Sequence, residues 1–113
     1  MAASIGGLLE PCLYTADLDR ARSFYRRLLD LDPVVDEDRI CVFRLPDASA
    51  LILFRQGAAL EPITLPGGVI PPHDGHGRIH FALAIPDDAV DFWRSRLRDL
   101  DIGVESEVDW SAE

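Results

Sequence analysis

Two side chains able to bind a divalent metal lie at matching places in this sequence of 113 residues. Glu10 lies within the apolar stretch 8–14, and His80 lies within the apolar stretch 78–85. Each stretch is predicted to be a strand, in which alternate side chains point to opposite faces. Each strand would therefore present one ligand away from the helix that follows it. The residues predicted to line a pocket on these two faces are Cys12, Tyr14, Arg78 and Ala82.

A carboxylate and an imidazole, joined by one further carboxylate, would suit Mn²⁺, Fe²⁺, Ni²⁺, Co²⁺ or Zn²⁺. An ion with an open coordination position can hold two adjacent substrate oxygens and stabilise the negative charge that forms on them. Taken singly, Glu10 could be an edge charge facing water, and His80 could be a satisfied histidine of the core. The hypothesis of metal binding is favoured because the two residues lie at equivalent places in two similar stretches.

An amphipathic helix is predicted after each of these strands. Asp17 can cap the first helix, because its carboxylate can accept from the free N–H groups of the first turn, and this helix would end near Leu31. Residues 86–88 would start the second helix, with a carboxylate available as the cap. The aromatic pairs Phe24–Tyr25 and Phe92–Trp93 hold the same place in the two helices, which indicates an internal repeat.

Three short strands are predicted after the first helix, at residues 34–35, 39–44 and 50–55. Together with the strand that carries Glu10, they give the order β, α, β, β, β. Residues 7–57 are therefore interpreted as one βαβββ module.

The pattern restarts in the last third of the sequence, with a strand at 78–85, the second helix and a strand at 104–108. Residues 78–113 are interpreted as a partial second module, because the first module has two more strands at the corresponding point. Either the sequence stops before the C-terminus of the protein, or the protein lacks these strands. The whole chain, residues 1–113, is predicted to be one domain.

Residues 58–77 are predicted to form a linker loop, because glycines and prolines interrupt any regular element there. A loop of this length is unusual in a compact domain, and such loops are often functional. His73 and His76 lie in this loop. Solvated side chains are the simplest interpretation, and a role as lid or ligand is the alternative.

The composition of the chain argues against some classes of binding partner, as its charge and hydropathy indicate. The net charge of −9 would repel a phosphate backbone, so a nucleic acid is not expected as a partner. No apolar run approaches the ~20 residues of a membrane span, and the first residues do not resemble a signal peptide. Cys12 and Cys41 are interpreted as reduced thiols of a cytoplasmic protein. Motifs for NAD, ATP or a serine nucleophile were not found.

The stretch 8–18, followed by 21–25, resembles the first strand and helix of the vicinal oxygen chelate superfamily, which includes glyoxalases, bleomycin-resistance proteins and extradiol dioxygenases. The stretch 77–86 resembles the strand that opens the second module of these proteins. This resemblance implies an α+β fold, in which two βαβββ modules form an open, cup-shaped mixed sheet with the helices outside. A divalent metal would lie inside the cup.

The resemblance also assigns the ligands by position. Glu10 would replace the commoner His or Gln of the first module, and His80 matches the His of the second module. Leu53 is the best match to a Glu ligand on the last strand of the first module, and its side chain cannot bind a metal.

The resemblance implies a metal-dependent lyase, isomerase or dioxygenase that acts on a small substrate with vicinal oxygens and forms a homodimer. The alternative is a non-catalytic protein that binds a small molecule or drug, as bleomycin-resistance proteins do. The acidic charge, Leu53 and the aromatic residues Trp93 and Trp110 favour this alternative. A third interpretation is an inactive module that only dimerises.

Overall fold

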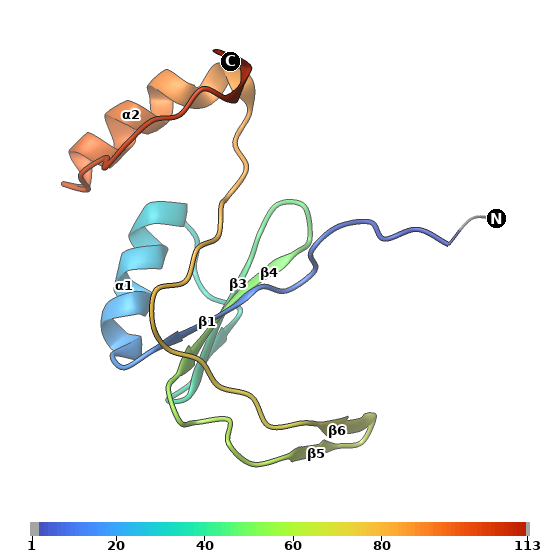
Figure 1. The fold of residues 1–113 in the computed structure, drawn as a ribbon. Helices are drawn as coiled ribbons and strands as arrows, with labels where there is room; N and C mark the ends of the chain where they lie inside the picture. The colour runs from blue at the N-terminus through green and yellow to red at the C-terminus, as the bar shows by residue number, and fades with distance from the viewer. Residues whose placement is uncertain (1–2, 113) are drawn as a thin grey trace. The chain divides into compact units, whose positions relative to one another are not determined.

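The computed structural model describes residues 3–112. In this part of the chain the fold is α+β, with a mixed four-stranded sheet, a separate two-stranded hairpin and two α-helices (Figure 1). The chain divides into two compact units, and the division falls between Ile79 and His80. Each unit is described here by itself.

The first unit contains the predicted βαβββ module. The sheet has the strand order β1-β4-β3-β2, in which β1 runs parallel to β4 and the other neighbours are antiparallel. Figure 1 shows α1 lying beside this sheet, and α1 contacts both β4 and β3. The elements in chain order are β1 (Cys12–Thr15), α1 (Leu18–Leu29), β2 (Val35–Asp36), β3 (Ile40–Arg44) and β4 (Ala50–Arg55).

Local chemistry sets both ends of α1. Asp17 caps the helix as predicted, because its Oδ1 accepts from the backbone N–H of Arg20 at 3.1 Å. The helix ends at Asp30, which has a left-handed conformation with φ of 52°. Leu18 is the buried residue at the start of α1. The cap and the left-handed end fix the length of the helix, and with it the part of the sheet that α1 covers.

The strand register separates the residues of the sheet into two faces. Leu13, Leu53 and Cys41 lie side by side on one face. We call this the α1 face, because Arg22 of α1 contacts Asp36, the neighbour of Cys41 in this row. The opposite face is called the distal face. Its residues in the register are Cys12, Tyr14, Val35, Ile40, Val42, Arg44, Ala50, Ile52 and Phe54.

The two faces differ in how completely they are buried. The four large side chains that are almost fully buried, Phe43, Leu51, Leu53 and Cys41, all lie on the α1 face. The distal face has a second cluster, formed by Val42, Ala50 and Ile52, with half-buried neighbours at its margin. Burial of apolar surface on both sides of β3 and β4 therefore makes these two strands the centre of the first unit.

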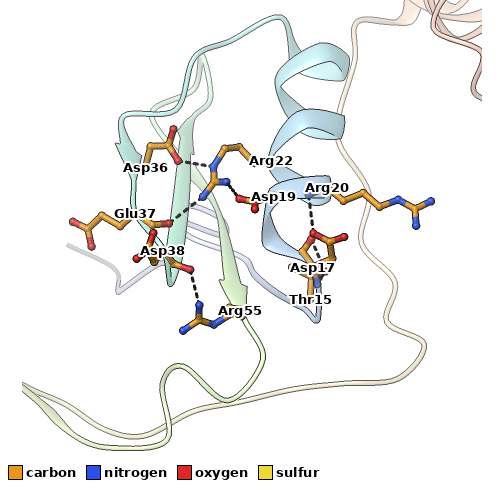
Figure 2. A network of polar contacts seen from close by, with 9 residues as sticks. All are labelled: Thr15, Asp17, Asp19, Arg20, Arg22, Asp36, Glu37, Asp38 and Arg55. Carbon is orange, nitrogen blue, oxygen red and sulfur yellow. Dashed lines mark hydrogen bonds and ion pairs between the residues drawn. The ribbon is translucent and has the colours of Figure 1, made fainter.

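Arg22 joins α1 to the edge of the sheet, as Figure 2 shows. Its Nε lies 2.5 Å from Asp36 Oδ1, an ion pair without the alignment of a hydrogen bond. Its Nη1 and Nη2 donate to Asp19 Oδ1 at 2.5 Å and to the carbonyl oxygen of Glu37 at 3.0 Å. Burial lowers the pKa of Arg22, but the hydrogen bond to Asp19 and the charge of Asp36 outweigh this, so the pKa is raised. The guanidinium is thus a permanent charge that holds the helix against β2.

The linker is more ordered than the sequence indicates. Residues 58–77 were predicted to lack regular structure, but they contain an antiparallel hairpin of β5 (Ile63–Leu65) and β6 (Gly68–Ile70). β-branched residues in both strands favour extended backbone, and Pro66–Gly67 forms the turn between them. The prediction was wrong for residues 63–70, because Gly67 and Gly68 were interpreted as breaks in structure, whereas Gly67 forms a tight turn and Gly68 begins β6.

The second unit contains one α-helix among its described residues. The predicted helix is present as η1 (Asp87–Ala89) followed by α2 (Val90–Asp99), and η2 (Trp110–Ala112) lies near the end of the chain. The predicted carboxylate cap is absent from this helix. No side chain caps either η1 or α2, and the first turn closes through a hydrogen bond from the N–H of Ala89 to the carbonyl oxygen of Pro86.

The strands predicted at 78–85 and 104–108 were wrong, since neither segment forms a strand in the described structure. A strand exists only where its backbone pairs with another strand, and the described residues of the second unit provide none. Both predicted helices are therefore present, and the internal repeat of a βαβββ unit stays a prediction. No helix in the described part of the chain is long and apolar enough to cross a membrane.

Candidate functional site

Glu10 lies beside the central strand of the first unit. The N–H groups of Ala50 and Ile52 donate to the carbonyl oxygens of Leu9 and Pro11 at 2.8 and 3.1 Å. These bonds extend the parallel pairing of β1 and β4 to the residues before β1, and alternation then places Glu10 on the distal face with Cys12. The side chain of Glu10 is exposed. The carboxylate is therefore held by a well-paired backbone and is open to solvent or to a ligand.

His80 and Ala82 belong to the second unit, where both are exposed and lie outside regular structure. Arg78 is exposed near the end of the first unit. The structure describes Glu10 and His80 within different units, so their pairing in one metal site stays a prediction. Among residues 3–112, no group of three or more His, Cys, Asp or Glu side chains lies close enough to hold a metal ion.

Leu53 is not the match to a ligand position that the resemblance indicated. It is 1% exposed and lies in the row of Leu13 and Cys41, on the α1 face. The side chains of β4 on the same face as Glu10 are those of Ile52 and Phe54, with Ala50 at the start of the strand. None of them can bind a metal, so the first unit offers the Glu10 carboxylate without a second donor from β4.

Cys12 lies next to Glu10 on the distal face and is half-buried. Its Sγ is 3.6 Å from the carbonyl oxygen of Glu10. Burial, followed by the negative charge of Glu10, raises the pKa of the Cys12 thiol. The thiolate is the reactive form of cysteine, so the raised pKa makes Cys12 less reactive than an ordinary cysteine, and its place on the distal face lets it line a pocket.

Cys41 lies on the α1 face and is fully buried. Burial raises the pKa of its thiol, against the opposing effect of the Arg22 charge. Both cysteines are free, and the sheet separates them. The two thiols therefore do not pair with each other, and their reduced state stays a prediction.

Tyr14 and His73 form a contact that the sequence did not predict. Tyr14 Oη lies 2.7 Å from His73 Nδ1, although 59 positions separate the two residues. The ring of Phe54 stacks on Tyr14 and meets His73 edge-on, with centroid distances of 5.7 and 4.6 Å. The interpretation of His73 as a solvated side chain was therefore wrong, whereas His76 is exposed. No sequence periodicity marks such a pair, because His73 follows a hairpin and lies in an irregular segment.

Two cavities lie at the margins of the first unit. The larger, about 340 Å³, is lined by residues of the N-terminal segment and of the turn between β3 and β4: Gly6, Gly7, Leu8, Leu9, Asp47 and Ser49. The smaller, about 220 Å³, is lined by Ala16, Asp17, Leu18, Asp19, Asp38 and Arg55. Figure 2 shows Asp17 and Asp19 bonded to Arg20 and Arg22 of α1, and Arg55 donating to the backbone carbonyl oxygen of Asp38 before β3. Neither cavity includes a predicted site residue.

The sequence matches one family of known proteins, and the fold is similar to that of solved structures. Residues 7–109 match the family described as the Glyoxalase/Bleomycin resistance protein/Dioxygenase superfamily. The fold resembles a crystal structure of lactoylglutathione lyase from Agrobacterium tumefaciens, with a TM-score of 0.81 and 29% identity, over 96% of this chain and 80% of that chain.

A second solved structure, an integron cassette protein from the mobile metagenome of the Halifax Harbour sewage outfall, is similar with a TM-score of 0.70. The identity is 15%, over 95% of this chain and 81% of that chain, which shows a shared fold alone. No curated protein matches the sequence.

Proposed function

Because this chain belongs to the Glyoxalase/Bleomycin resistance protein/Dioxygenase superfamily, we propose that it is a divalent-metal-dependent enzyme acting on a small substrate with adjacent oxygens. Glu10 and His80 would be two of the metal ligands. The observation that carries the proposal is the position of Glu10, whose exposed carboxylate lies on the face of the sheet away from α1. The likeness to a lactoylglutathione lyase supports an enzyme of this type.

The side chains of Glu10 and His80 are of types that bind divalent metals, but two ligands are too few to form a metal site. Glu10 supplies a carboxylate and His80 an imidazole, and both side chains are exposed. At least one further donor is needed, and β4 does not offer it on the face of Glu10. When bound with an open coordination position, the metal would supply Lewis-acid stabilisation of an oxyanion. The apolar cluster of Val42, Ala50 and Ile52 would exclude water beside the carboxylate.

The first test is the metal content of the purified chain, measured by mass spectrometry after loading with Mn²⁺, Ni²⁺ or Zn²⁺. We expect about one ion per chain, with loss of the ion in Glu10→Gln and in His80→Ala, because each removes one of few ligands. Glu61→Gln and His76→Ala are the matched controls, since both side chains are exposed and neither is a proposed ligand. Unchanged metal content in the double variant of Glu10 and His80 would refute the assignment.

A second candidate is a protein that binds a small molecule without a metal. It is favoured by one observation, the presence of Ile52 and Phe54 on β4 where a ligand of the metal would be required. Titration of a metal-free sample with a basic glycopeptide at low salt tests this function, and the acidic net charge predicts binding. The homodimer and the cytoplasmic location stay predictions. Sedimentation at micromolar concentration tests the first, and a monomer would contradict it.

A further inference from the structure

Residues 57–74 of the first unit form an arm whose two ends are tied together. The N–H of His73 donates to the carbonyl oxygen of Ala59 at 2.9 Å, and the N–H of Gly57 donates to Asp74 Oδ1 at 3.1 Å. Ala59 is buried, at 5% exposure. These hydrogen bonds close the arm at its base, and the hairpin of β5 and β6 is its tip (Figure 1).

The base of the arm is held against side chains of the distal face. His73 Nδ1 lies 2.7 Å from Tyr14 Oη, and the His73 ring meets the Phe54 ring edge-on. Gly75, the residue after the arm, passes so close to Tyr14 that an added Cβ would lie 2.7 Å from its ring carbon Cδ2. The base is therefore ordered before any partner binds, which lowers the entropy that binding would cost.

The tip of the arm has one apolar face. The register pairs Ile63 with Ile70 and Leu65 with Gly68, so these side chains point to one side of the hairpin, and Thr64 and Val69 point to the other. We call the side formed by Ile63, Leu65 and Ile70 the tip face.

The tip face is open to solvent in the single chain. Leu65 and Ile70 are 49% and 41% exposed. The hairpin forms a two-stranded sheet of its own. A two-stranded hairpin is only marginally stable in water unless a further element packs on it. The tip face therefore has the properties of a surface that is stabilised by a partner.

The distribution of charge indicates which partner fits the tip. Residues 62–73 contain no Asp, Glu, Lys or Arg, and this is the longest such run in the sequence. The whole chain has a net charge of −9, so two copies repel each other wherever their acidic surfaces meet. Contact between copies is therefore least opposed at the tip, whereas a basic partner would be attracted to the acidic surfaces instead.

We propose that the arm is a self-association surface, in which the tip face of one chain packs against the tip face of a second copy about a two-fold axis. Such a contact uses the same residues on both copies, which an apolar and uncharged patch allows. The inference gives the predicted homodimer a defined surface and does not depend on the proposed metal ligands. The tip is small beside the roughly 800 Å² per partner of a standard interface, so we expect a dissociation constant in the micromolar range.

The test is sedimentation velocity of the full chain over a range of micromolar concentrations. The wild type should change from monomer to dimer as the concentration rises. Leu65→Asp and Ile70→Asp should each weaken the dimer about 100-fold or more, because the two copies of the new carboxylate would be buried against each other. Both positions are partly exposed in the single chain, so the urea midpoint measured at low concentration should be retained.

Two control variants add the same charge elsewhere. Val69→Asp lies on the opposite face of the same hairpin and is 61% exposed, and Val34→Asp lies outside the arm and is 60% exposed. Both should associate as the wild type does. Hydrogen exchange gives a second measurement, since the amides of β5 and β6 should exchange more slowly as the wild-type concentration rises, and should not do so in Ile70→Asp.

The outcomes are distinct. A dimer that is lost in Leu65→Asp and Ile70→Asp and kept in both controls supports the inference. A wild type that stays monomeric at every concentration overturns it, as does a dimer that persists in both tip variants. An equal loss in Val34→Asp also overturns it, because added charge alone would then break the dimer. A chain that dimerises through the tip and binds no divalent metal would overturn the proposed function alone.

Discussion

The two units contain similar sequence patterns but differ in the structure that these patterns form. In the first unit, the apolar residues of β3 and β4 pair and bury their side chains, and Leu51 and Leu53 are at most 1% exposed. In the second unit, residues 81–85 are likewise all apolar, yet they form no strand, and Leu83 and Ile85 are 36% and 41% exposed. The helices show the same contrast, because α1 packs on a sheet and α2 has no fully buried residue.

The difference shows that strands and helices depend on their neighbours to different extents. A helix satisfies its backbone hydrogen bonds within its own segment, so α2 forms from local sequence. A strand satisfies them only with a partner, so an apolar segment does not form a strand by itself. The fold of the first unit is therefore stabilised by contacts between segments, and that of the second unit mainly by contacts within one helix and its ends.

The largest expected effect is on the free energy of unfolding, and it is found by comparing two phenylalanines. Phe43 is fully buried on the α1 face, whereas Phe92 of α2 is 61% exposed. Phe43→Ala should lower the free energy of unfolding by about 3–5 kcal/mol, because it leaves a cavity under α1. Phe92→Ala should change it by about 0.5 kcal/mol or less. Urea unfolding followed by circular dichroism measures both. Similar losses for the two variants would mean that the contrast between the units is absent in solution.

A smaller effect compares two arginines that each contact two acidic side chains. Arg22 pairs with Asp19 and Asp36 and is 16% exposed, whereas Arg94 pairs with Asp91 and Glu107 and is 50% exposed. Arg22→Gln should cost about 2 kcal/mol, since it breaks charged hydrogen bonds in a largely buried place.

Arg94→Gln is the control and should leave stability unchanged, because water and salt screen an exposed pair. Raising the salt concentration should reduce any effect at Arg94 and leave most of the effect at Arg22. Both variants are measured by thermal unfolding at low and high salt. A larger loss in Arg94→Gln would contradict the comparison.

The smallest expected effect is a change in the stability of the protein with pH, and it compares two similar turns. Asp47 accepts from the side chain and the N–H of Ser49, and Asp109 accepts in the same way from Ser111. The hydrogen bond from the serine side chain, followed by that from its N–H, lowers the pKa of each carboxyl group.

A carboxyl group with a lowered pKa in the folded state stabilises that state above its unfolded pKa of about 3.9, and this stabilisation is lost as the pH falls through the folded value. Asp47→Asn should therefore destabilise the protein slightly at pH 7, and the difference from wild type should begin to shrink near about pH 4 and disappear once the pH is below the lowered folded pKa. Asp109→Asn should not affect unfolding of the sheet, because Asp109 lies in the second unit. Urea unfolding between pH 7 and pH 2.5 measures this, and a difference that grows at low pH would refute it.

Most of the first unit could be predicted from the sequence because its signals are local. Asp17 is a helix cap in the sequence and in the structure, and β4 has the predicted bounds of residues 50 and 55. The predicted strands at 78–85 and 104–108 failed for the opposite reason, since pairing is not a property of the segment itself. The βαβββ order and the superfamily were predicted because their signal lies in the order of elements.

The candidate site was harder to predict from the sequence than the fold of the first unit. β4 is apolar at every position from residue 50 to residue 54, so the sequence does not tell which of its side chains share a face with Glu10, and Leu53, which was matched to a ligand position, lies on the other face. The pairing of Tyr14 with His73 depends on the path of an irregular segment. Glu10 was the more predictable residue, because a strand with a known helix partner fixes its face.

The strand order of the first unit also bears on how the protein folds. β3 and β4 are joined by a short turn, whereas β1 reaches β4 only after α1, β2 and β3 have been made. Closing a short loop costs less entropy than closing a long one, so the β3–β4 hairpin is the natural early structure and β1 docks onto it later. We therefore expect the backbone around Glu10 to become ordered only when the sheet is complete, so that the carboxylate reaches its final place late in folding.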